Sequence, residues 1–456
     1  MSSKKNGLVN VSNMSYPKVV AFGFAMLIVI GTILLMLPIS SRDGHSAGFI
    51  NALFTATSAS CVTGLVVYDT YLHWTLFGQI VILLLIQIGG LGFITILAFF
   101  AMLMNRRIGL KERSLLQESV NTMYIGGIVK LTKKIIIGTI LIEVLGAILL
   151  SIRFIPKMGV SIGIFNAIFL SISAFCNAGF DLMGRYSQYA SITVEPYNYD
   201  PIVILTLSIL ITLGAIGFFV WDDFTKNKFH FSQYRLHSKI AISVTILMTA
   251  IGTPIFFILE YHNSLEDMPI FQKILSSLFS VIVPRTAGFE IVPTGNLTSG
   301  STLMIILYML IGGSSGSTAG GIKTTTFAVL MLSLVSSIKG ENGINVFGRR
   351  LEDNVLKRAC SVISINVILA LTGAMIICAS QPELMLKDVL FEVFSAIDTV
   401  GMTTGITRDL NTVSRIVIAF LMFLGRVGSL SFALIFTDGN NCLQSAQNPV
   451  EKINIG

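Results

Sequence analysis

The sequence predicts an all-α polytopic membrane protein of four tandem repeats, in which two spanning helices enclose one short re-entrant pore helix. Three observations predict it: the composition, the alternation of long and short apolar runs, and the fourfold recurrence of the short run. The 456 residues are 53% hydrophobic and only 12% charged, with a mean hydropathy of +0.79. Soluble proteins carry roughly 25% charged residues, so this chain lacks the side chains needed to cover soluble domains.

The long and short apolar runs alternate along the chain. A helix needs about 20 apolar residues to cross a bilayer core, and runs of that kind lie near 17–38, 74–104, 131–155, 200–221, 238–261, 301–336, 355–380 and 413–436. Shorter runs, which are typical of re-entrant segments, lie at 48–60, 162–179, 270–288 and 384–401. The order long, short, long therefore occurs four times, giving eight spanning helices around one central pore.

The four short runs resemble one another in sequence. Each has a phenylalanine followed by a glycine: Phe54 and Gly64, Phe169 and Gly179, Phe279 and Gly288, Phe391 and Gly401. The step between them is ten residues in three copies and nine in the third. Because self-similarity at regular places marks a repeat architecture, we interpret the short runs as corresponding parts of four repeats.

The distribution of Lys and Arg predicts that both termini are cytoplasmic. With the amino terminus inside, the inner segments are the tail and the loops 105–134, 222–239 and 337–358. They hold 19 of the 31 Lys and Arg residues, whereas the outer connections hold nine. Such an inner excess is typical of cytoplasmic loops. It explains the net charge of +7 without a nucleic-acid partner, which we do not expect.

These observations divide the chain into four repeats between two tails. The expected boundaries are 1–16 for the N-terminal tail, 17–104 for repeat 1, 105–221 for repeat 2 with its preceding basic loop, 222–336 for repeat 3, 337–436 for repeat 4 and 437–456 for the C-terminal tail. The expected location is the plasma membrane, with several passes through the lipid bilayer.

Four re-entrant segments that end in glycine suit a cation pore. Backbone that stops being helical at membrane depth survives only where protein or water covers it. Rings of backbone carbonyls can replace the water around a dehydrated monovalent cation, and glycine has the freedom to turn those carbonyls inward. Thr399, Val400 and Gly401 also match the start of the TVGYG potassium-channel signature, although Met402 then departs from it.

Acidic residues favour the outer side. The outer connections carry 14 of the 24 Asp and Glu residues, and a negative mouth raises the local concentration of cations. For any single acid, the need to keep an outer loop soluble is an equally simple explanation.

The fourfold layout, the four glycines and the string Arg285 to Phe289 resemble the Ktr/Trk/HKT superfamily of potassium transporters, and in particular the membrane subunit of bacterial Ktr systems. The resemblance covers about 17–436. It implies potassium uptake by a homodimer on a cytosolic nucleotide-binding ring of RCK type, with sodium as a possible second ion and no covalent cofactor. It places the potassium filter at Val62, Thr63, Gly64, Asn177, Ala178, Gly179, Thr286, Ala287, Gly288, Thr399, Val400 and Gly401. Glycine rather than serine at Gly64 is associated in the superfamily with potassium selectivity.

The sixth long run is interrupted by small residues at 312–325. Its glycines and lysine are Gly312, Gly313, Gly316, Gly320, Gly321 and Lys323. A phosphate-binding loop is not favoured, because Ile322 spoils the spacing of that motif and no strand–helix unit surrounds it. Small residues at mid-membrane instead indicate a broken helix beside a water path, although close helix packing would explain some of the glycines. The resemblance implies a gate loop below the filter, under control of the regulator.

Arg426 is a charge in the middle of the last long run, between Gly425 and Val427. Intramembrane charges usually face a bundle interior or a water path. By resemblance Arg426 projects into the pore below the filter and holds the gate loop. The alternative is a buried structural pair with Glu143.

Two further features stay open. Asp398 stands where the superfamily usually has a small residue, so it either stiffens the filter or is incidental. The basic loop 105–134 either docks the regulator or is simply a positive inner loop.

The predicted function is channel-like potassium uptake. The alternative is a sodium- or proton-coupled secondary transporter, a class that usually has inverted repeats and acids within its spans. Here the repeats are parallel, and Glu143 is the one acid that does not lie at an end of a predicted span. An enzyme is not expected, because the five histidines are scattered and show no metal-binding spacing.

Overall fold

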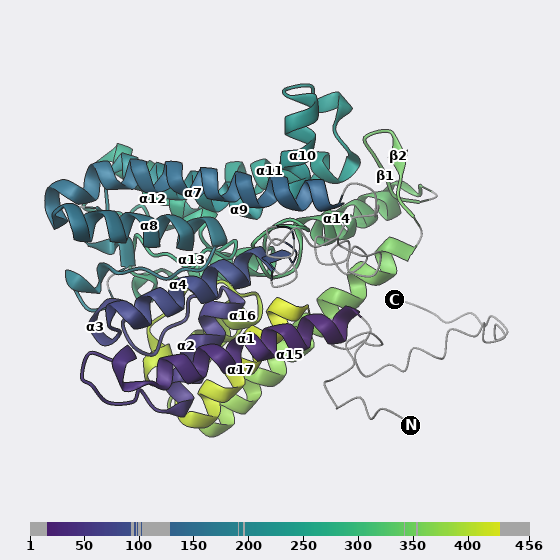
Figure 1. The fold of residues 1–456 in the computed structure, drawn as a ribbon. Coiled ribbons are helices and arrows are strands. Elements are labelled where there is room, and N and C mark those ends of the chain that lie inside the picture. Colours follow the sequence, from purple (N-terminus) through teal and green to yellow (C-terminus); the bar gives the residue numbers. More distant parts are fainter. Residues whose placement is uncertain are drawn as a thin grey trace, which may run out of the picture.

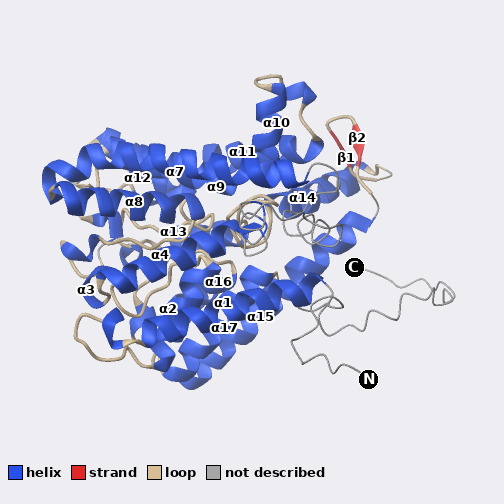
Figure 2. Cartoon of the chain, viewed as in Figure 1, coloured by secondary structure: helices blue, strands red, loops and turns tan. Residues whose placement is uncertain are grey.

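A computed structural model describes residues 16–428, apart from 93, 94, 97, 99–101, 103–127, 190, 195, 196, 342 and 353. The two tails and most of the loop 105–134 lie outside the described residues. The regular structure of the described residues is helical, apart from one small hairpin (Figures 1 and 2). This confirms the expected all-α class.

Four long helices correspond to the first span of each predicted repeat. They are α1 (Tyr16–Met36), α7 (Ile128–Met158), α11 (Leu236–Glu260) and α15 (Asn354–Ser380). All four are long and apolar enough to cross a membrane, and they run across Figure 1 in similar directions. Apolar side chains such as Ile33, Leu141, Ile258 and Met375 are exposed on them. Because the chain spans a bilayer, these exposed faces are the lipid-facing surface.

Four shorter helices follow the long ones. They are α2 (Phe49–Cys61), α8 (Val160–Cys176), α12 (Ile270–Ile282) and α16 (Leu386–Ile397). The phenylalanines of the repeated sequence, Phe54, Phe169, Phe279 and Phe391, are all completely or almost completely buried. Each short helix therefore packs into the centre of the molecule through the same side chain.

The long run that follows each short helix does not form one continuous helix. The sequence predicted such a break in the third unit, at 312–325, whereas it predicted continuous runs in the other three. Helix α4 (Leu76–Leu91) ends before Gly92, α9 (Pro201–Ala215) bends by 95° into α10 (Phe218–Asn227), and α17 (Thr412–Val427) ends before Gly428. In the third pair, a loop separates α13 (Ser299–Leu310) from α14 (Thr324–Lys339). Gly92, Gly217 and Gly428 have positive φ angles of 85°, 98° and 93°, a conformation that glycine adopts without strain.

The other described elements are short and lie in connections. They are η2 (Pro38–Ser40), α3 (Thr70–His73), η3 (Met183–Arg185), η4 (Ser191–Thr193), η5 (Phe231–Gln233), η6 (Thr294–Asn296), β1 (Asn345–Val346), β2 (Arg349–Arg350) and η7 (Ile406–Arg408). The strands β1 and β2 form an antiparallel hairpin in which Asn345 pairs with Arg350.

The helices pack in a closed cycle. The second helix of each pair contacts the short helix of the next: α4 packs on α8, α9 on α12, α13 on α16, and α17 returns to α2. Figure 1 shows the resulting arrangement, with α7, α8, α9, α11 and α12 above and α1, α2, α15 and α17 below. The four units thus surround one axis, although they are consecutive parts of a single chain.

Glycines allow this packing to be close at three corresponding places. A Cβ atom at Gly89, Gly214 or Gly425 would overlap the backbone carbonyl oxygen of Ser60, Phe175 or Ile397, respectively. Each of those carbonyls belongs to the residue four positions before a filter glycine. The second helices therefore lie directly against the ends of the short helices.

Replacing Gly214 by alanine should destabilise the fold, because the new methyl group would overlap the Phe175 carbonyl and approach Thr318 Oγ1 to 2.9 Å. Overpacking of this kind costs about 1–3 kcal/mol. Thermal unfolding of the purified protein measures the effect. Gly300→Ala is the control, since its Cβ would meet its nearest neighbour at 3.4 Å, an ordinary contact. Equal midpoints for the two variants would contradict the close packing at Gly214.

Candidate functional site: a ring of four glycines with a loop beneath it

The four filter segments share one backbone conformation. Two residues before each glycine, a non-glycine residue adopts positive φ: Val62 at 59°, Asn177 at 60°, Thr286 at 71° and Thr399 at 52°. The glycines Gly64, Gly179, Gly288 and Gly401 also have positive φ, between 69° and 100°. Non-glycine residues with positive φ are uncommon and cluster at functional sites. Their recurrence at one position in all four segments marks this backbone as specialised.

The four glycines form a closed ring. A Cβ on Gly64 would lie 2.6 Å from Ala178 O, one on Gly179 would lie 2.9 Å from Gly288 Cα, and one on Gly288 would lie 2.6 Å from Val400 O. A Cβ on Gly401 would overlap Thr63 O, which closes the ring. Each segment therefore meets the backbone of the next in chain order, and only glycine fits.

Serine hydroxyl groups hold three of the segments. Ser58 Oγ accepts a hydrogen bond from Gly64 N at 3.0 Å, Ser395 Oγ accepts one from Gly401 N at 3.0 Å, and Ser173 Oγ accepts one from Phe180 N at 3.0 Å. Each serine precedes its filter glycine by six residues. These serines lie within the repeated runs, but the sequence analysis assigned them no role.

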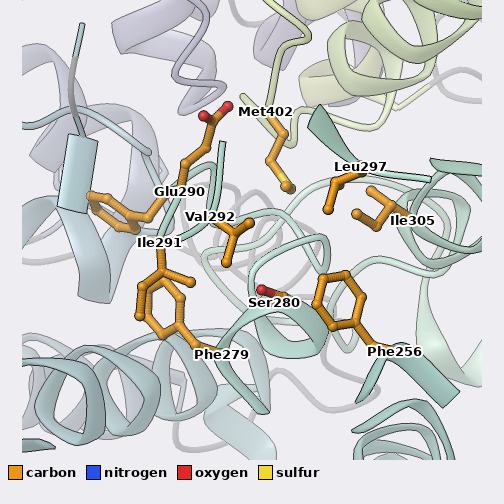
Figure 3. A pocket seen from close by; sticks show the side chains of 10 residues that line it. Phe256, Phe279, Ser280, Glu290, Ile291, Val292, Leu297, Ile305 and Met402 are labelled. Carbon is orange, nitrogen blue, oxygen red and sulfur yellow. The ribbon is translucent and has the colours of Figure 1, made fainter. Parts of the chain in front are cut away.

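The third segment is built differently. Ile282 occupies the position of the serine, and Ala287 N donates to Val283 O. Behind the segment lies a small pocket of about 10 Å³, which Phe279, Ser280 and Phe289 help to line. Figure 3 shows the Glu290 carboxylate directed away from this pocket. In this segment, where nine residues separate Phe279 from Gly288, mainly apolar packing takes the place of the serine hydrogen bond.

An open cavity of about 280 Å³ lies above the ring. All four filter glycines line it, together with residues from the connections of all four repeats. Asp69, Asp181 and Glu290 are its acidic lining residues, and Arg408 is its basic one. The Arg408 guanidinium lies 3.4 Å from the centre of the Tyr189 ring, on one wall of the cavity. The cavity therefore joins the ring to the side of the molecule where acids outnumber bases.

Burial keeps two of these acids less ionised than usual. Burial, with smaller contributions from the neighbouring Asp69 and Glu290, raises the pKa of Asp181 to about 7, although a hydrogen bond from Met183 N lowers it. Burial also raises the pKa of Glu290. The charge of the cavity therefore changes near neutral pH.

The loop between α13 and α14 lies on the other side of the ring. Its Thr318 Oγ1 donates to Phe175 O at 3.1 Å, at the end of the short helix α8. Ser314 N donates to Ala215 O at 2.8 Å, and a parallel bridge between Ile311 and Ile322 closes the loop at its base. The loop is thus held against the second repeat as well as its own.

Two glycines of this loop contact the fourth filter segment. A Cβ on Gly320 would overlap the Thr399 hydroxyl, and one on Gly321 would lie 3.2 Å from Asp398 O. Lys323 turns back onto the loop, and its Nζ donates to Ala319 O at 2.8 Å and to Gly320 O at 3.2 Å. Of the other predicted gate residues, Gly312 N donates to Ile322 O, Gly313 O accepts from Thr324 N, and Gly316 O accepts from Phe218 N.

Arg426 connects the loop to the first repeat. Its guanidinium donates to Thr318 O at 2.5 Å, to Gly90 O at 3.0 Å and to Gly89 O. Glu143 instead accepts a hydrogen bond from Gln87 Nε2 at 3.3 Å and contacts Cys176 Sγ. The structure therefore places Arg426 beside the loop rather than in the alternative pair with Glu143.

Asp398 is completely buried behind the fourth segment. Its carboxylate accepts a hydrogen bond from Asn366 Nδ2 of α15 at 2.8 Å. Asp398 thus ties the end of the short helix α16 to a long helix, an arrangement that the sequence analysis left open and whose partner it did not identify.

Within the part of the chain that the structure describes, no group of three or more His, Cys, Asp or Glu side chains is placed to hold a metal ion. Beside each glycine of the ring lies a backbone carbonyl oxygen of a neighbouring segment, from Ala178, Ala287, Val400 or Thr63, and carbonyl oxygens are ligands for a hard monovalent cation.

Comparison with known proteins identifies the family. The TrkH family model, described as cation transport protein, matches residues 4–442. The chain belongs to the TrkH/Ktr family of cation transport proteins. Ktr system potassium uptake protein B of Bacillus subtilis is 40% identical, with 96% of each chain covered. Potassium/sodium uptake protein NtpJ of Enterococcus hirae is 37% identical, with 97% of this chain and 98% of that protein covered.

A solved structure agrees with the fold. The potassium transporter TrkH from Vibrio parahaemolyticus aligns with a TM-score of 0.76, at 16% identity, over 95% of this chain and 87% of that one. The expected relationship to potassium transporters and the absence of an enzymatic role are confirmed by the family. The TrkH/Ktr chain described here is thus a membrane protein of a potassium-uptake family.

The apparent affinity for external potassium should rise as the outer pH increases from 6 to 8. Asp181, with a pKa of about 7, is mostly neutral at pH 6 and mostly ionised at pH 8, so the cavity becomes more negative. One added charge at short range is worth about 1 kcal/mol, or roughly fivefold in affinity. Potassium uptake at a series of concentrations and pH values measures this. Asp181→Asn should flatten the profile and the exposed Asp267→Asn should not; an unchanged profile in Asp181→Asn would contradict it.

Proposed function

We propose that this protein carries potassium into the cell through a channel-like filter made by the glycine ring. The observation that carries the proposal is the closure of the ring: four corresponding glycines meet one another's backbones and line one outer cavity. Such a ring can replace the hydration shell of an ion by carbonyl oxygens. The ion in the pore is potassium, and sodium is the second candidate because the Enterococcus relative is named for both ions.

The proposed orientation places the cavity outside and both termini in the cytoplasm of a cell whose plasma membrane the chain spans. The excess of Lys and Arg in the inner segments supports it. The parallel order of the four repeats and the open cavity above a closed ring favour a pore over the alternative of a sodium- or proton-coupled secondary transporter, a class that usually has inverted repeats.

We propose further that the loop 312–325 is the gate. Thr318 Oγ1 donates to Phe175 O at the end of α8, and Gly320 lies against Thr399 of the fourth filter segment. The Arg426 guanidinium holds the loop by donating to Thr318 O. A loop under the filter, held by a few hydrogen bonds, can block the path and still be displaced. Arg426 then acts as a latch, and its positive charge opposes the passage of cations while the loop is closed.

The proposed partners are a second copy of the chain and a cytosolic nucleotide-binding ring of RCK type. The resemblance to Ktr membrane subunits supports both. The course of α14 also suits a regulator, because this helix begins at Thr324, directly after the loop, and ends at Lys339 on the inner side. A partner that moved the end of α14 would move the gate.

Replacing Gly288 by serine should lower the selectivity for potassium over sodium or abolish uptake, because the side chain would approach Val400 O. Gly405→Ser is a matched control: Gly405 lines the same cavity and also has positive φ, but nothing lies within 4 Å of its Cβ position. Uptake of both ions by a transport-deficient host provides the measurement. If Gly288→Ser and Gly405→Ser keep the same selectivity as the native protein, the ring is not the filter.

Replacing Gly320 by alanine should increase flux and weaken its dependence on the regulator. The added methyl group would overlap the Thr399 hydroxyl and push the loop away from the filter. Flux into vesicles with and without the regulator measures this, with Gly300→Ala as the control. A lower flux with unchanged dependence on the regulator would contradict the gate assignment.

A further inference from the structure

Helix α10 leaves the bundle sideways at its inner end. It is bent by 95° from α9, and Figure 1 shows it standing across the direction of the long helices. Lys134 at the start of α7 and Arg235 before α11 form ion pairs with Asp222 of α10, at 3.5 and 3.2 Å. In the proposed orientation α7 and α11 begin at the inner leaflet, so α10 lies at the level of its headgroups.

The free end of α10 is aromatic and basic. Phe229 is 88% exposed and Phe224 is 49% exposed, and their rings contact each other edge to face. The two acids of α10, Asp222 and Asp223, are buried and paired with cations, whereas Lys228 is exposed. Exposed aromatic rings beside cations are typical of a surface that enters the headgroup region of an anionic leaflet.

The backbone at Lys228 supports a role for this side chain. Lys228 ends α10 with φ 49° and ψ −124°, a conformation suited to glycine. A strained residue that is kept in place is a mark of function. Lys239, on the following helix, adds a second cation, and its ammonium lies 5.9 Å from the Phe231 ring.

The elbow between α9 and α10 holds the gate loop. Phe218 N, the first amide of α10, donates to Gly316 O at 2.7 Å. On the α9 side, Gly214 O and Ala215 O accept from Thr318 N and Ser314 N, at 3.2 and 2.8 Å. A displacement of α10 would therefore act on the loop through three backbone hydrogen bonds.

We propose that the end of α10 and the turn after it, residues 224–239, bind anionic phospholipid headgroups of the inner leaflet, and that this contact sets the position of the gate loop through the elbow. The inference rests on the proposed orientation and gate. Opposite charge, and the position of α10 across the inner ends of α7 and α11, identify a membrane, rather than a soluble partner, as the occupant.

Quenching by brominated lipids tests the contact. Phe229→Trp in the full-length protein is placed in vesicles of phosphatidylcholine with increasing brominated phosphatidylglycerol, and the native protein, with Trp74 and Trp221, supplies the background. We expect stronger quenching by brominated phosphatidylglycerol than by brominated phosphatidylcholine. When Lys228→Gln and Lys239→Gln are combined with Phe229→Trp, half-maximal quenching should require a higher fraction of brominated phosphatidylglycerol, by about fivefold per lysine. Equal quenching by both lipids would exclude an anionic preference, and no quenching would indicate a protein partner instead.

Potassium flux tests the coupling. Native flux should differ at least severalfold between vesicles with and without phosphatidylglycerol, whereas Lys228→Gln/Lys239→Gln should show the same flux in both. Lys157→Gln/Lys387→Gln, which removes two cations from the outer side, is the control and should behave as the native protein does. If native flux is the same with and without phosphatidylglycerol, the lipid contact does not act on the gate loop and the coupling is wrong. Flux in vesicles of phosphatidylcholine alone measures the pore itself, so failure of the proposed potassium uptake is distinguished from failure of the lipid coupling.

Discussion

Backbone N–H and C=O groups in the middle of a membrane need hydrogen-bond partners, and the rest of this structure depends on that requirement. Four short helices stop at that depth, where non-helical backbone survives only against protein or a water-filled cavity. Ser58, Ser173 and Ser395 supply hydroxyl oxygens for the amides that follow, and glycines let the next helix approach the carbonyls at the helix ends. The carbonyls that remain can face the axis. The same constraint that holds the four segments together therefore prepares a path for an ion.

The third repeat departs from the other three in its filter segment and in its second helix. Its filter segment has no serine anchor, and it carries Arg285, a buried cation whose Nη2 donates to Thr245 Oγ1 at 3.1 Å. Its second helix is divided into α13 and α14 by a loop beneath the ring. The ring itself stays regular because every segment must present the same glycine to its neighbour. The fourfold regularity is thus kept at the ring and lost at the loop beneath it.

Much of this arrangement could be predicted from the sequence because apolar length and position are local properties. The four long helices and the four short ones lie close to their predicted ranges. The breaks after α4 and α17 were missed, although a signal was present: Gly89 to Gly92, Gly214 to Gly217 and Gly425 to Gly428 share a glycine at each end. Apolarity continues past these glycines, so hydropathy alone could not show that the helices end there.

By itself the sequence determined that the chain lies in a membrane, that it contains four similar units, and which four glycines correspond. These conclusions follow from hydrophobicity and repetition, which need no knowledge of contacts. Only the tertiary structure decided that the glycines meet in one ring, that Arg426 reaches the loop carbonyl at Thr318 rather than Glu143, and that Asn366 holds Asp398. Arg426 and Thr318 are 108 residues apart, and Gly64 and Gly401 come from the first and the last repeat. Their pairing depends on how the helices close around the axis, which no local pattern records.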